Sequence, residues 1–565
     1  MPTSSRDPVM IQLSPDPGIA ERQIEAVIFY LTTCGYIDSE FDLREKAFVR
    51  SFLRKLVTAR VDGQGNLDPE VRFEQIERQH EHYVERFQQI DYDVRSLFTE
   101  AVADGEDPQG FVLAKLQLRC YELFRELPLG SREALLAIVD EFIGADGVVH
   151  PAEVKFRNDL AALLGAEVRA EEVAGTEAKL EVQKPTELRS SQEDHPFFKG
   201  FEHHYSADPE EIRKQIDADL RLLEQVEASW DERREAGQGR LRGKQSIEDF
   251  DEPGDFLDGH VHLVSRPNDF ELIVLGDLHG CYSCLKAAVM QSDFMNKVRR
   301  YRADPSAHPE PRLVLLGDYI DRGRFSFNGV LRAVLKLYLT VPEHVVVLRG
   351  NHEYYIEYKG RVYGGVKPAD TINSLSQVLP GEVFERYLAF FEKMPNSLFY
   401  DNLLFVHGGI PRDALMRERY EDLSSFNDPD IRFQMLWSDP SRADVIPDEL
   451  QRSSARFPFG RQQFRRFMSR LGCALMVRGH EKVNAGFRDM YPRDDIRLLT
   501  LFSAGGVAND DVPEDSNYRD VRPMALTIAR KGGETTVTPW AIDYRSYQRP
   551  ELNQFFATDP NLVAS

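Results

Sequence analysis

The chain has 565 residues, of which 42% are hydrophobic and 29% are charged, and its formal net charge is −23. A chain of this length predicts two or three domains, and its apolar fraction is large enough to form buried cores. The acidic balance argues against a general nucleic-acid-binding protein, which needs a basic surface, but it allows a small anionic substrate in a local basic pocket.

Signals for export or membrane insertion are not evident in the sequence. The first residues contain no basic stretch followed by an apolar run, and no uncharged apolar run approaches the ~18 residues of a membrane span. The cysteines are odd in number and scattered, which does not indicate a disulfide framework; they are Cys34, Cys120, Cys281, Cys284 and Cys473. We therefore expect a cytoplasmic protein without a membrane span.

The N-terminal part is predicted to be helical. Residues 1–17 are polar and contain several prolines, which predicts a flexible tail, and residues 18–170 carry apolar residues at helical spacing. Residues 30–48 and 141–156 each read as a helix, a turn with glycine, an acidic segment and a second helix, which indicates a weak internal repeat. Residues 171–254 are expected to form a linker that contains a charged helix after Asp208.

The sequence changes character near residue 255. Short runs rich in β-branched residues and leucine each end in glycine and a polar residue, as in FELIVLGD, RLVLLGD, HVVVLRGN and NLLFVHGG, and helical stretches lie between them. This alternation predicts an α/β domain whose functional site lies at the ends of the strands. A hairpin is expected at Gly532-Gly533, and residues 549–565 are expected to be a C-terminal tail.

Five predicted strands each deliver metal-binding residue types into a loop that contains glycine. One Gly-Asp after a strand is usually only a turn, but five such motifs in order are not explained that way. Carboxylate, imidazole and amide ligands together suit Mn, Fe, Zn or Mg rather than a thiolate site. The side chains are Asp277 and His279, Asp318 with Asp321 and Arg322, Asn351 and His352, His407, and His480.

The motifs GDLHG (276–280), GDYIDRG (317–323) and GNHE (350–353) are similar to the three signatures of the PPP family of metallophosphoesterases. Flanking stretches such as VPEHVVVLRGNHE and MLWSDP resemble its Ser/Thr phosphoprotein phosphatase branch. The resemblance covers about half of the chain. It implies that residues 255–548 form an α/β metallophosphoesterase domain, a β-sandwich flanked by helices, preceded by an all-α domain.

The resemblance also implies roles for the motif residues. Two divalent metal ions would be held by Asp277, His279, Asp318, Asn351, His407 and His480, with Asp318 bridging them, and a metal-bridging hydroxide would attack the phosphate in line. Arg322 and Asn351 would bind phosphate oxygens. His352 would protonate the leaving alkoxide, and Asp321 would orient its imidazole.

The sequence departs from the family pattern at two places. The second phosphate-binding arginine should lie between WSDP and FPFG, where Arg452 and Arg456 both occur; the spacing fits neither fully, and we favour Arg452. In FSAGGVAND (502–510), Val507 stands where these phosphatases carry a tyrosine, so the part of the substrate site near this loop is expected to differ.

Cys281 and Cys284 form a C-x-x-C pair directly after GDLHG. Residues three apart share a helix face, so the thiols are expected mainly to pack in the core. A redox pair remains open, because a helix N-terminus lowers a thiol pKa. A zinc site would need two further ligands.

Acidic stretches at residues 38–45 and 146–153 resemble the turns of TerB-like helical domains, and acids that cap a second helix explain them equally well. The resemblance implies a metal-responsive module, and we expect the doubled helical unit to be a regulatory or partner-binding domain. We expect a phosphatase that acts on phosphoserine or phosphothreonine in proteins. A hydrolase of a small molecule such as a dinucleoside polyphosphate, and a signalling scaffold, are the alternatives.

Overall fold

The computed structural model describes residues 16–37, 43–63, 67–98, 107–125, 129–143, 150–165, 180–188, 193–358, 361–364, 379–452 and 454–557, together with shorter stretches between these ranges. The chain folds into two compact units. One comprises residues 1–102, 106–169 and 446–454, and the other comprises residues 103–105, 170–445 and 455–565. Among the described residues, no helix combines the length and the hydrophobicity that crossing a membrane requires.

The first unit is helical, as expected. Its helices begin where the sequence offers a cap: α1 and α3 start with Asp-Pro, and Asp16 accepts a hydrogen bond from the N–H of Ile19 at 2.9 Å. The rings of Tyr30 and Phe124 pack edge to face in its core, with centroids 4.8 Å apart. The helices are α1 (Pro17–Gly35), α2 (Leu43–Asp62), α3 (Pro69–Leu97), α4 (Pro108–Arg125), α5 (Leu129–Ile143), α6 (Pro151–Gly165) and the short α16 (Asp448–Arg452).

The predicted repeat corresponds to two helix pairs, α1 with α2 and α5 with α6. Residues 38–40 and 144–149, which hold much of the two acidic stretches, lie outside the described residues. At the start of α6, the carboxylate of Glu153 is buried and accepts the backbone N–H of His150 at 3.1 Å. This contact is a helix cap, which supports the capping explanation for that acid.

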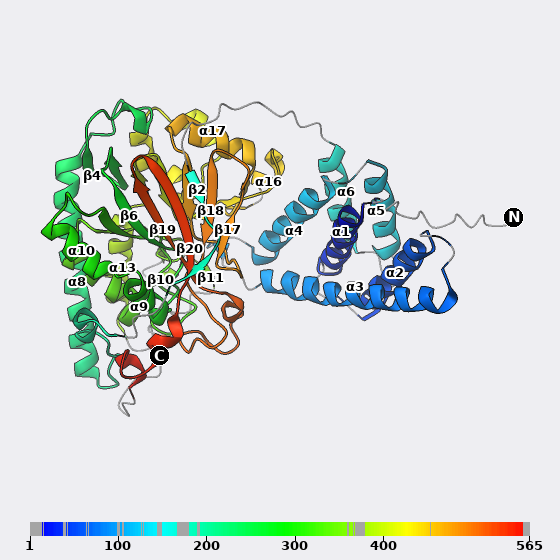
Figure 1. Cartoon of the computed structure of the whole chain (residues 1–565), viewed down its shortest axis with the longest axis horizontal. Coiled ribbons are helices and arrows are strands. Elements are labelled where there is room, and N and C mark those ends of the chain that lie inside the picture. Colours follow the sequence, from blue (N-terminus) through cyan, green and yellow to red (C-terminus); the bar gives the residue numbers. More distant parts are fainter. Residues whose placement is uncertain are drawn as a thin grey trace. The chain divides into compact units, whose positions relative to one another are not determined.

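The second unit contains two mixed sheets (Figure 1). The first sheet, in spatial order, consists of β2 (Leu180–Val182), β20 (Glu534–Ala541), β19 (Met524–Lys531), β6 (Phe270–Leu275), β7 (Glu310–Leu315) and β8 (Val345–Val347), with β3 (Thr186–Glu187) also paired to β20. The second consists of β17 (Phe487–Asp489), β18 (Arg497–Leu501), β16 (Leu475–Arg478), β13 (Leu403–Val406), β12 (Ser397–Tyr400), β5 (Val261–Ser265) and β4 (Gly254–Asp258). The expected hairpin joins β19 to β20, with Lys531 opposite Glu534.

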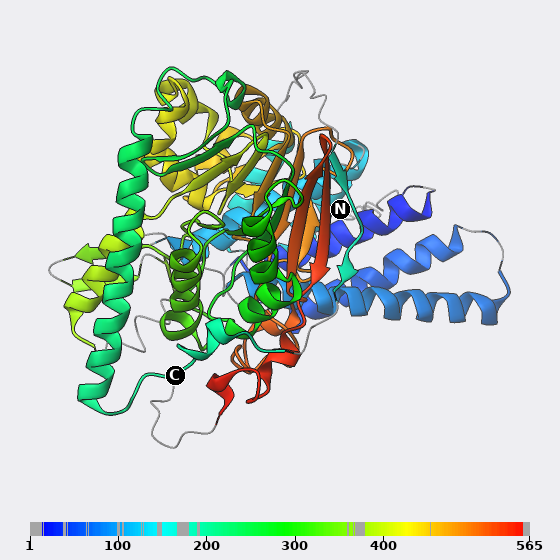
Figure 2. The same cartoon turned by 60° about the vertical axis from the view of Figure 1, so that its left-hand side comes forward.

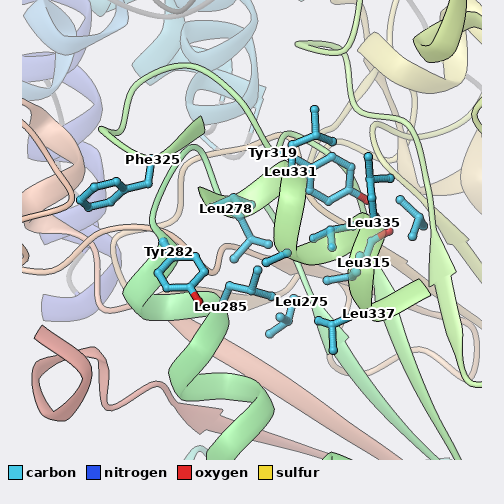
Figure 3. Packing of buried hydrophobic residues seen from close by; sticks show 14 of the residues in the cluster. Leu275, Leu278, Tyr282, Leu285, Leu315, Tyr319, Phe325, Leu331, Leu335 and Leu337 are labelled. Carbon is cyan, nitrogen blue, oxygen red and sulfur yellow. Dashed lines mark hydrogen bonds between the residues drawn. The ribbon is translucent and has the colours of Figure 1, made fainter. Parts of the chain in front are cut away.

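The two sheets pack face to face, which explains why their strands are apolar on both sides. Along β6, Phe270, Leu272 and Val274 belong to the core between the sheets, whereas Ile273 and Leu275 belong to the core under the helices. This alternation follows from the two-residue period of a strand. Figure 3 shows the core under the helices, where Leu275 and Leu315 of the sheet meet Leu285, Leu331 and Leu335.

Helices cover the outer faces of both sheets, so that four layers result. The first sheet is covered by α7 (Pro196–Lys199), α8 (Pro209–Gly237), α9 (Tyr282–Gln291), α10 (Phe294–Ala303), α11 (Arg332–Thr340) and α13 (Gly381–Lys393), and the second by α14 (Asp413–Arg419), α15 (Pro429–Trp437) and α17 (Arg461–Leu471). Short 3-10 helices are η1 (Ile247–Asp249), η3 (Leu423–Asn427), η4 (Asn517–Asp520), η5 (Tyr544–Gln548) and η6 (Gln554–Phe556), and η2 (Ser326–Leu331) is a π-helix. The remaining short strands are β1 (Val102–Ala103), β9 (Tyr355–Tyr358), β10 (Arg361–Gly364), β11 (Val366–Lys367), β14 (Asp439–Pro440) and β15 (Pro458–Phe459).

The stretch expected as a linker, residues 171–254, differs from that expectation in the residues described. Strands β2 and β3 extend the first sheet beside β20, and α8 lies along the second unit in Figure 2. Trp230 of α8 is buried and stacks on Phe390 with centroids 5.3 Å apart, while Asp219 pairs with the buried Arg332 at 2.7 Å. The apolar stripe of α8 therefore belongs to the core of the second unit.

The predicted tail after residue 548 also differs from the expectation as far as residue 557. Leu552, Asn553 and Phe555 are buried, and the backbone N–H of Gln554 donates to the buried Glu202 at 3.0 Å. These residues anchor the C-terminal segment to the same core as α9.

Replacing Trp230 by Ala is expected to lower the free energy of unfolding of the second unit by about 3–5 kcal/mol, because a large buried ring leaves a cavity. Urea denaturation followed by the fluorescence of Trp437 and Trp540 reports on this unit, since both lie in it. Gln225→Ala, at an exposed position of the same helix, should change it by less than about 0.5 kcal/mol. Equal stabilities of the two variants would mean that α8 is not part of this folding unit.

Candidate metal centre

The predicted site residues follow the carboxyl ends of strands from both sheets. Strands β6, β7 and β8 of the first sheet lead into the loops of GDLHG, GDYIDRG and GNHE, and β13 and β16 of the second lead into His407 and His480. Hydrogen bonds fix these loops to one another. The N–H of His279 donates to the carbonyl of Asp318 at 2.8 Å, and the N–H of His480 donates to Oδ1 of Asp277 at 2.8 Å.

Two glycines of the motifs are explained by close approach. A Cβ atom on Gly350 would lie 2.2 Å from Oδ1 of Asp318, and one on Gly479 would lie 2.2 Å from Oδ1 of Asp277. Any side chain at these positions would displace a carboxylate of the site, because contacts below 3.0 Å are not tolerated.

Left-handed backbone conformations concentrate in this site. Non-glycine residues rarely adopt positive φ, and where they do the surrounding structure must hold them. The site residues concerned are His279 (φ 40°), Asp318 (56°), Asp321 (66°), Arg322 (68°) and His480 (69°). The surrounding structure thus holds these loops in a backbone conformation of unfavourable free energy. In this conformation their side chains converge on the candidate metal centre.

One group of ligand atoms surrounds one carboxylate oxygen of Asp318. Nε2 of His279 lies 3.4 Å from Oδ2 of Asp318 and 3.8 Å from Oδ2 of Asp277. Nε2 of His352 is also close, 4.0 Å from the same oxygen of Asp318. All four side chains are buried. Among these residues, the ligand atoms of His279, Asp318 and His352 lie close enough together to share one cation, whereas Asp277 groups with Asp318 and His407.

A second group surrounds the other oxygen of Asp318. Nε2 of His407 lies 3.4 Å from Oδ1 of Asp318 and 2.8 Å from Oδ1 of Asn351. Nδ1 of His480 is 2.8 Å from the same amide oxygen of Asn351. Asp318 therefore presents one oxygen to each group, an arrangement in which one carboxylate could serve both.

In two of the histidines, a hydrogen bond at Nδ1 fixes the direction in which Nε2 points. Nδ1 of His279 lies 3.0 Å from the carbonyl of Ile320, and Nδ1 of His407 lies 3.0 Å from the carbonyl of Leu316. A backbone carbonyl at Nδ1 holds the proton there and leaves Nε2 as a metal ligand. Burial lowers the pKa of both imidazoles, which favours the neutral, ligating form.

The donor set fits divalent cations. Burial raises the pKa of Asp318 to about 8, and burial together with the nearby charge of Asp318 raises that of Asp277 to about 7. Oδ2 of Asp277 is buried and has no hydrogen-bond donor among the described residues. A site that combines ionisable carboxylates, neutral imidazoles and an orphaned carboxylate oxygen is completed by positive charge between these groups.

His352 and Asp321 form the expected pair beside the metal ligands. Nδ1 of His352 lies 2.7 Å from Oδ2 of Asp321, so that Nε2 points to the site. Arg322 is half-buried and adjacent: after burial itself, its charge is the largest cause that lowers the pKa of His352. An imidazole, a carboxylate and a guanidinium therefore adjoin the two ligand groups.

The structure does not support the preference for Arg452 over Arg456. Arg452 belongs to the first unit, and its side chain is 71% exposed and 3.6 Å from Asp448 on the same helix. Arg456 is buried in the second unit, where Nε donates to Asp439 at 2.7 Å and a terminal nitrogen donates to the carbonyl of His480 at 3.3 Å. Its charge partly offsets the rise that burial causes in the pKa of Asp318. Arg456 is therefore the arginine beside the ligands.

Two acids matter here that sequence reasoning did not single out. Glu353, the last residue of GNHE, accepts the N–H groups of Asp318 at 2.8 Å and Gly350 at 2.9 Å, and so ties two loops together. Asp439 of WSDP holds Arg456 and also accepts from the buried Arg478 at 2.9 Å. Glu353 lies in GNHE and Asp439 lies in MLWSDP. Their positions in these motifs were the sequence signal that could have identified them.

Cys281 and Cys284 are both buried in the core under the helices, at the start of α9. Burial raises the pKa of the Cys284 thiol well above its usual value. Asn509 donates to its sulfur at 3.5 Å. This environment favours packing over thiolate chemistry.

Comparison with known proteins defines the class. Residues 270–484 match the family model of calcineurin-like phosphoesterases. These residues therefore form a calcineurin-like phosphoesterase domain.

Several relatives carry the name of a serine/threonine phosphatase. The chain is 27% identical over 277 residues to a "Probable serine/threonine-protein phosphatase" of Encephalitozoon cuniculi, which covers 48% of this chain and 55% of that protein. It is 26% identical over 298 residues to the serine/threonine-protein phosphatase 4 catalytic subunit of Kluyveromyces lactis, covering 51% of this chain and 86% of that protein. A solved protein serine/threonine phosphatase of Saccharomyces cerevisiae matches with 18% identity and a TM-score of 0.35, over 57% of this chain and 89% of that one. The chain thus spans about half the length of the first relative and most of the second.

Proposed function

We propose that the second unit hydrolyses phosphoserine and phosphothreonine monoesters in proteins. The observation that carries this proposal is the convergence of carboxylate, imidazole and amide ligands on the two oxygens of Asp318, beside a histidine–aspartate pair and two arginines. The relatives named serine/threonine-protein phosphatases support the substrate class.

Each residue has a role in this proposal. Two divalent cations (Mn, Fe, Zn or Mg), when bound, would lower the pKa of water and polarise the phosphate oxygens. The ligands would be Asp277, His279, Asp318, Asn351, His407 and His480.

The remaining residues would act on the phosphate and on the leaving group. Arg322 and Arg456 would bind equatorial phosphate oxygens, together with the amide of Asn351, and stabilise the charge that develops there. His352 would donate a proton from Nε2 to the leaving alkoxide, while Asp321 holds Nδ1 and favours the charged imidazole.

Replacing Arg456 by Ala is expected to lower kcat/KM for a phosphothreonine peptide by about 10²–10³-fold, since a donor aimed at the reacting phosphate is lost. Arg452→Ala should stay within about twofold, because its side chain is exposed. Steady-state kinetics of both variants decides between the two arginines. A large loss for Arg452→Ala with an active Arg456→Ala would restore the original preference.

The substrate class is tested with the full chain, Mn and three substrates: a phosphothreonine peptide, a phosphotyrosine peptide of the same sequence, and a dinucleoside polyphosphate. Phosphate release from the phosphothreonine peptide that a chelator abolishes and Mn restores would support the proposal. Exclusive turnover of the dinucleotide would replace it with the small-molecule hydrolase. Binding of the peptide without turnover, with Mn bound, would indicate a scaffold.

We further propose that the helical first unit is a TerB-like regulatory domain with a protein partner of its own, and that the protein acts in the cytoplasm. The paired helices α1–α2 and α5–α6 support the first point, and the five unpaired cysteines support the second. Activity measured with and without residues 1–169 tests the regulatory role.

A further inference from the structure

An aromatic side chain that the motifs do not include packs against a metal-ligand position. The ring of Tyr518, in η4, lies with its centroid 5.3 Å from that of His279 and 5.3 Å from that of Phe502. Phe502 is itself 6.1 Å from His279. The rings of Phe502 and Tyr518 thus flank the imidazole of His279, although Tyr518 comes 16 residues after Phe502 in the chain.

The local sequence explains how Tyr518 reaches this place. Gly505 and Gly506 have φ of 115° and 121°, and a Cβ on Gly505 would lie 2.4 Å from the carbonyl oxygen of Tyr518. The N–H of Gly506 donates to that same carbonyl at 3.3 Å. The glycine pair therefore allows the turn that carries Tyr518 to close onto the loop after β18.

The same segment contains the departure at Val507. The side chain of Val507 is 72% exposed, so it does not line a buried site. The aromatic contact beside the ligands comes instead from Tyr518, which is half-buried.

We propose that Tyr518 is a positioning residue that fixes the imidazole plane of His279 for metal binding. The hydrogen bond at Nδ1 fixes one edge of the imidazole, and neighbouring rings limit the tilt of its plane about that edge. The carbonyl of Ile320 holds Nδ1 at 3.0 Å, and the ring of His352 meets it edge to face at 4.7 Å. Tyr518 and Phe502 restrict the rotation of the ring about its Cβ–Cγ bond, which keeps Nε2 directed at Asp318. This inference rests on the proposed metal site.

Tyr518→Ala is expected to raise the Kd for Mn at one of two sites by about tenfold or more, because residues that orient a ligand typically contribute 10–100-fold to metal affinity. Isothermal titration calorimetry on the full chain measures this Kd without any substrate. Tyr518→Phe should bind Mn within about twofold of the unsubstituted chain, since the ring makes the contact. Activity lost in Tyr518→Ala should return at high Mn concentration, which a collapsed site would not allow.

Tyr301 offers a matched control. Its ring packs edge to face on His344 with centroids 5.7 Å apart, and Nδ1 of His344 lies 2.8 Å from a backbone carbonyl, yet His344 belongs to no ligand group. Tyr301→Ala should leave Mn binding unchanged. A tenfold loss of Mn affinity in both variants would show that the effect is not specific to His279.

A second route moves the ring without removing it. Gly505→Ala should weaken Mn binding in the same way, because its Cβ would push the Tyr518 carbonyl away. Unchanged Mn affinity in folded Tyr518→Ala protein would overturn the inference. If that variant does not fold, Tyr518→Leu, which keeps most of the side-chain volume, decides: an unchanged Kd contradicts the positioning role. A natural chain that binds no Mn would overturn the proposed function as well.

Discussion

Asp318→Asn is expected to lower kcat/KM for a phosphothreonine peptide by at least about 10³-fold, because the stabilisation that two cations supply amounts to several kcal/mol. The variant removes the one negative charge that both ligand groups share. Oδ1 of Asp318 is 3.4 Å from His407, and Oδ2 is 3.4 Å from His279. An amide at this position is uncharged and replaces one carboxylate oxygen by an NH2 group, so it offers an oxygen to only one of the two ligand groups.

The backbone should tolerate this change. Asp318 has φ of 56°, and Asn enters the left-handed region as readily as Asp does. Asp401→Asn is therefore a matched control: Asp401 has φ of 52° and pairs with Arg530, and it belongs to no ligand group. We expect Asp401→Asn to keep activity within about twofold.

Metal content separates the explanations for a loss of activity. Elemental analysis of purified Asp318→Asn should show fewer metal ions per chain than the unsubstituted protein, with circular dichroism unchanged. Normal turnover by this variant would contradict the assignment of Asp318 as the bridging ligand. Lost turnover with retained binding of the phosphopeptide would argue for catalysis over a scaffold role.

His352→Ala is expected to have an effect that depends on the leaving group. Removing a general acid typically costs about 10²–10⁴-fold, and we expect a kcat loss in this range for the phosphothreonine peptide. An activated aryl phosphate has a leaving group that needs no proton, so its kcat should fall by less than about tenfold. Asp321→Asn should show the same pattern with a smaller loss, since Oδ2 of Asp321 is 2.7 Å from Nδ1 of the imidazole.

The comparison of two substrates makes this test specific. A lost metal ligand would reduce turnover of both substrates alike, whereas a lost acid reduces only that of the poor leaving group. Equal losses for the two substrates would therefore make His352 a ligand, a role that its 4.0 Å distance from Asp318 also permits geometrically. His344→Ala, at a buried histidine outside the ligand groups, controls for destabilisation: it should lower Tm without changing kcat.

The sequence was informative about the candidate ligands because each stands within a few residues of a buried strand. Asp277, Asp318 and Asn351 follow β6, β7 and β8 directly, so strand order alone brings them to one edge of the first sheet. A Cβ atom on the glycine before each of them would collide with a nearby segment, as one on Gly350 would with Asp318. Local patterns of this kind are readable from a single chain.

The sequence was less informative where position depends on distant partners. Arg452 and Arg456 are four residues apart, and no local pattern ranks them; Asp439 and His480 hold Arg456 from outside that segment. Helix α8 looked like a charged linker because its polar face is extensive. The buried face of this helix includes Trp230, which packs against Phe390, 160 residues further along the chain. The sequence alone does not reveal this contact.

The sequence by itself determined the fold class of the second unit, the helical nature of the first, the metal-binding residue types and their order along the strands. Only the tertiary structure decided which arginine lies at the site, that residues 180–254 belong to the second unit, and that Tyr518 flanks His279. The physical reason is the range of the interactions. Strand ends and tight turns are set by neighbours in sequence, whereas a buried ion pair or a ring contact forms between segments that the fold alone brings together.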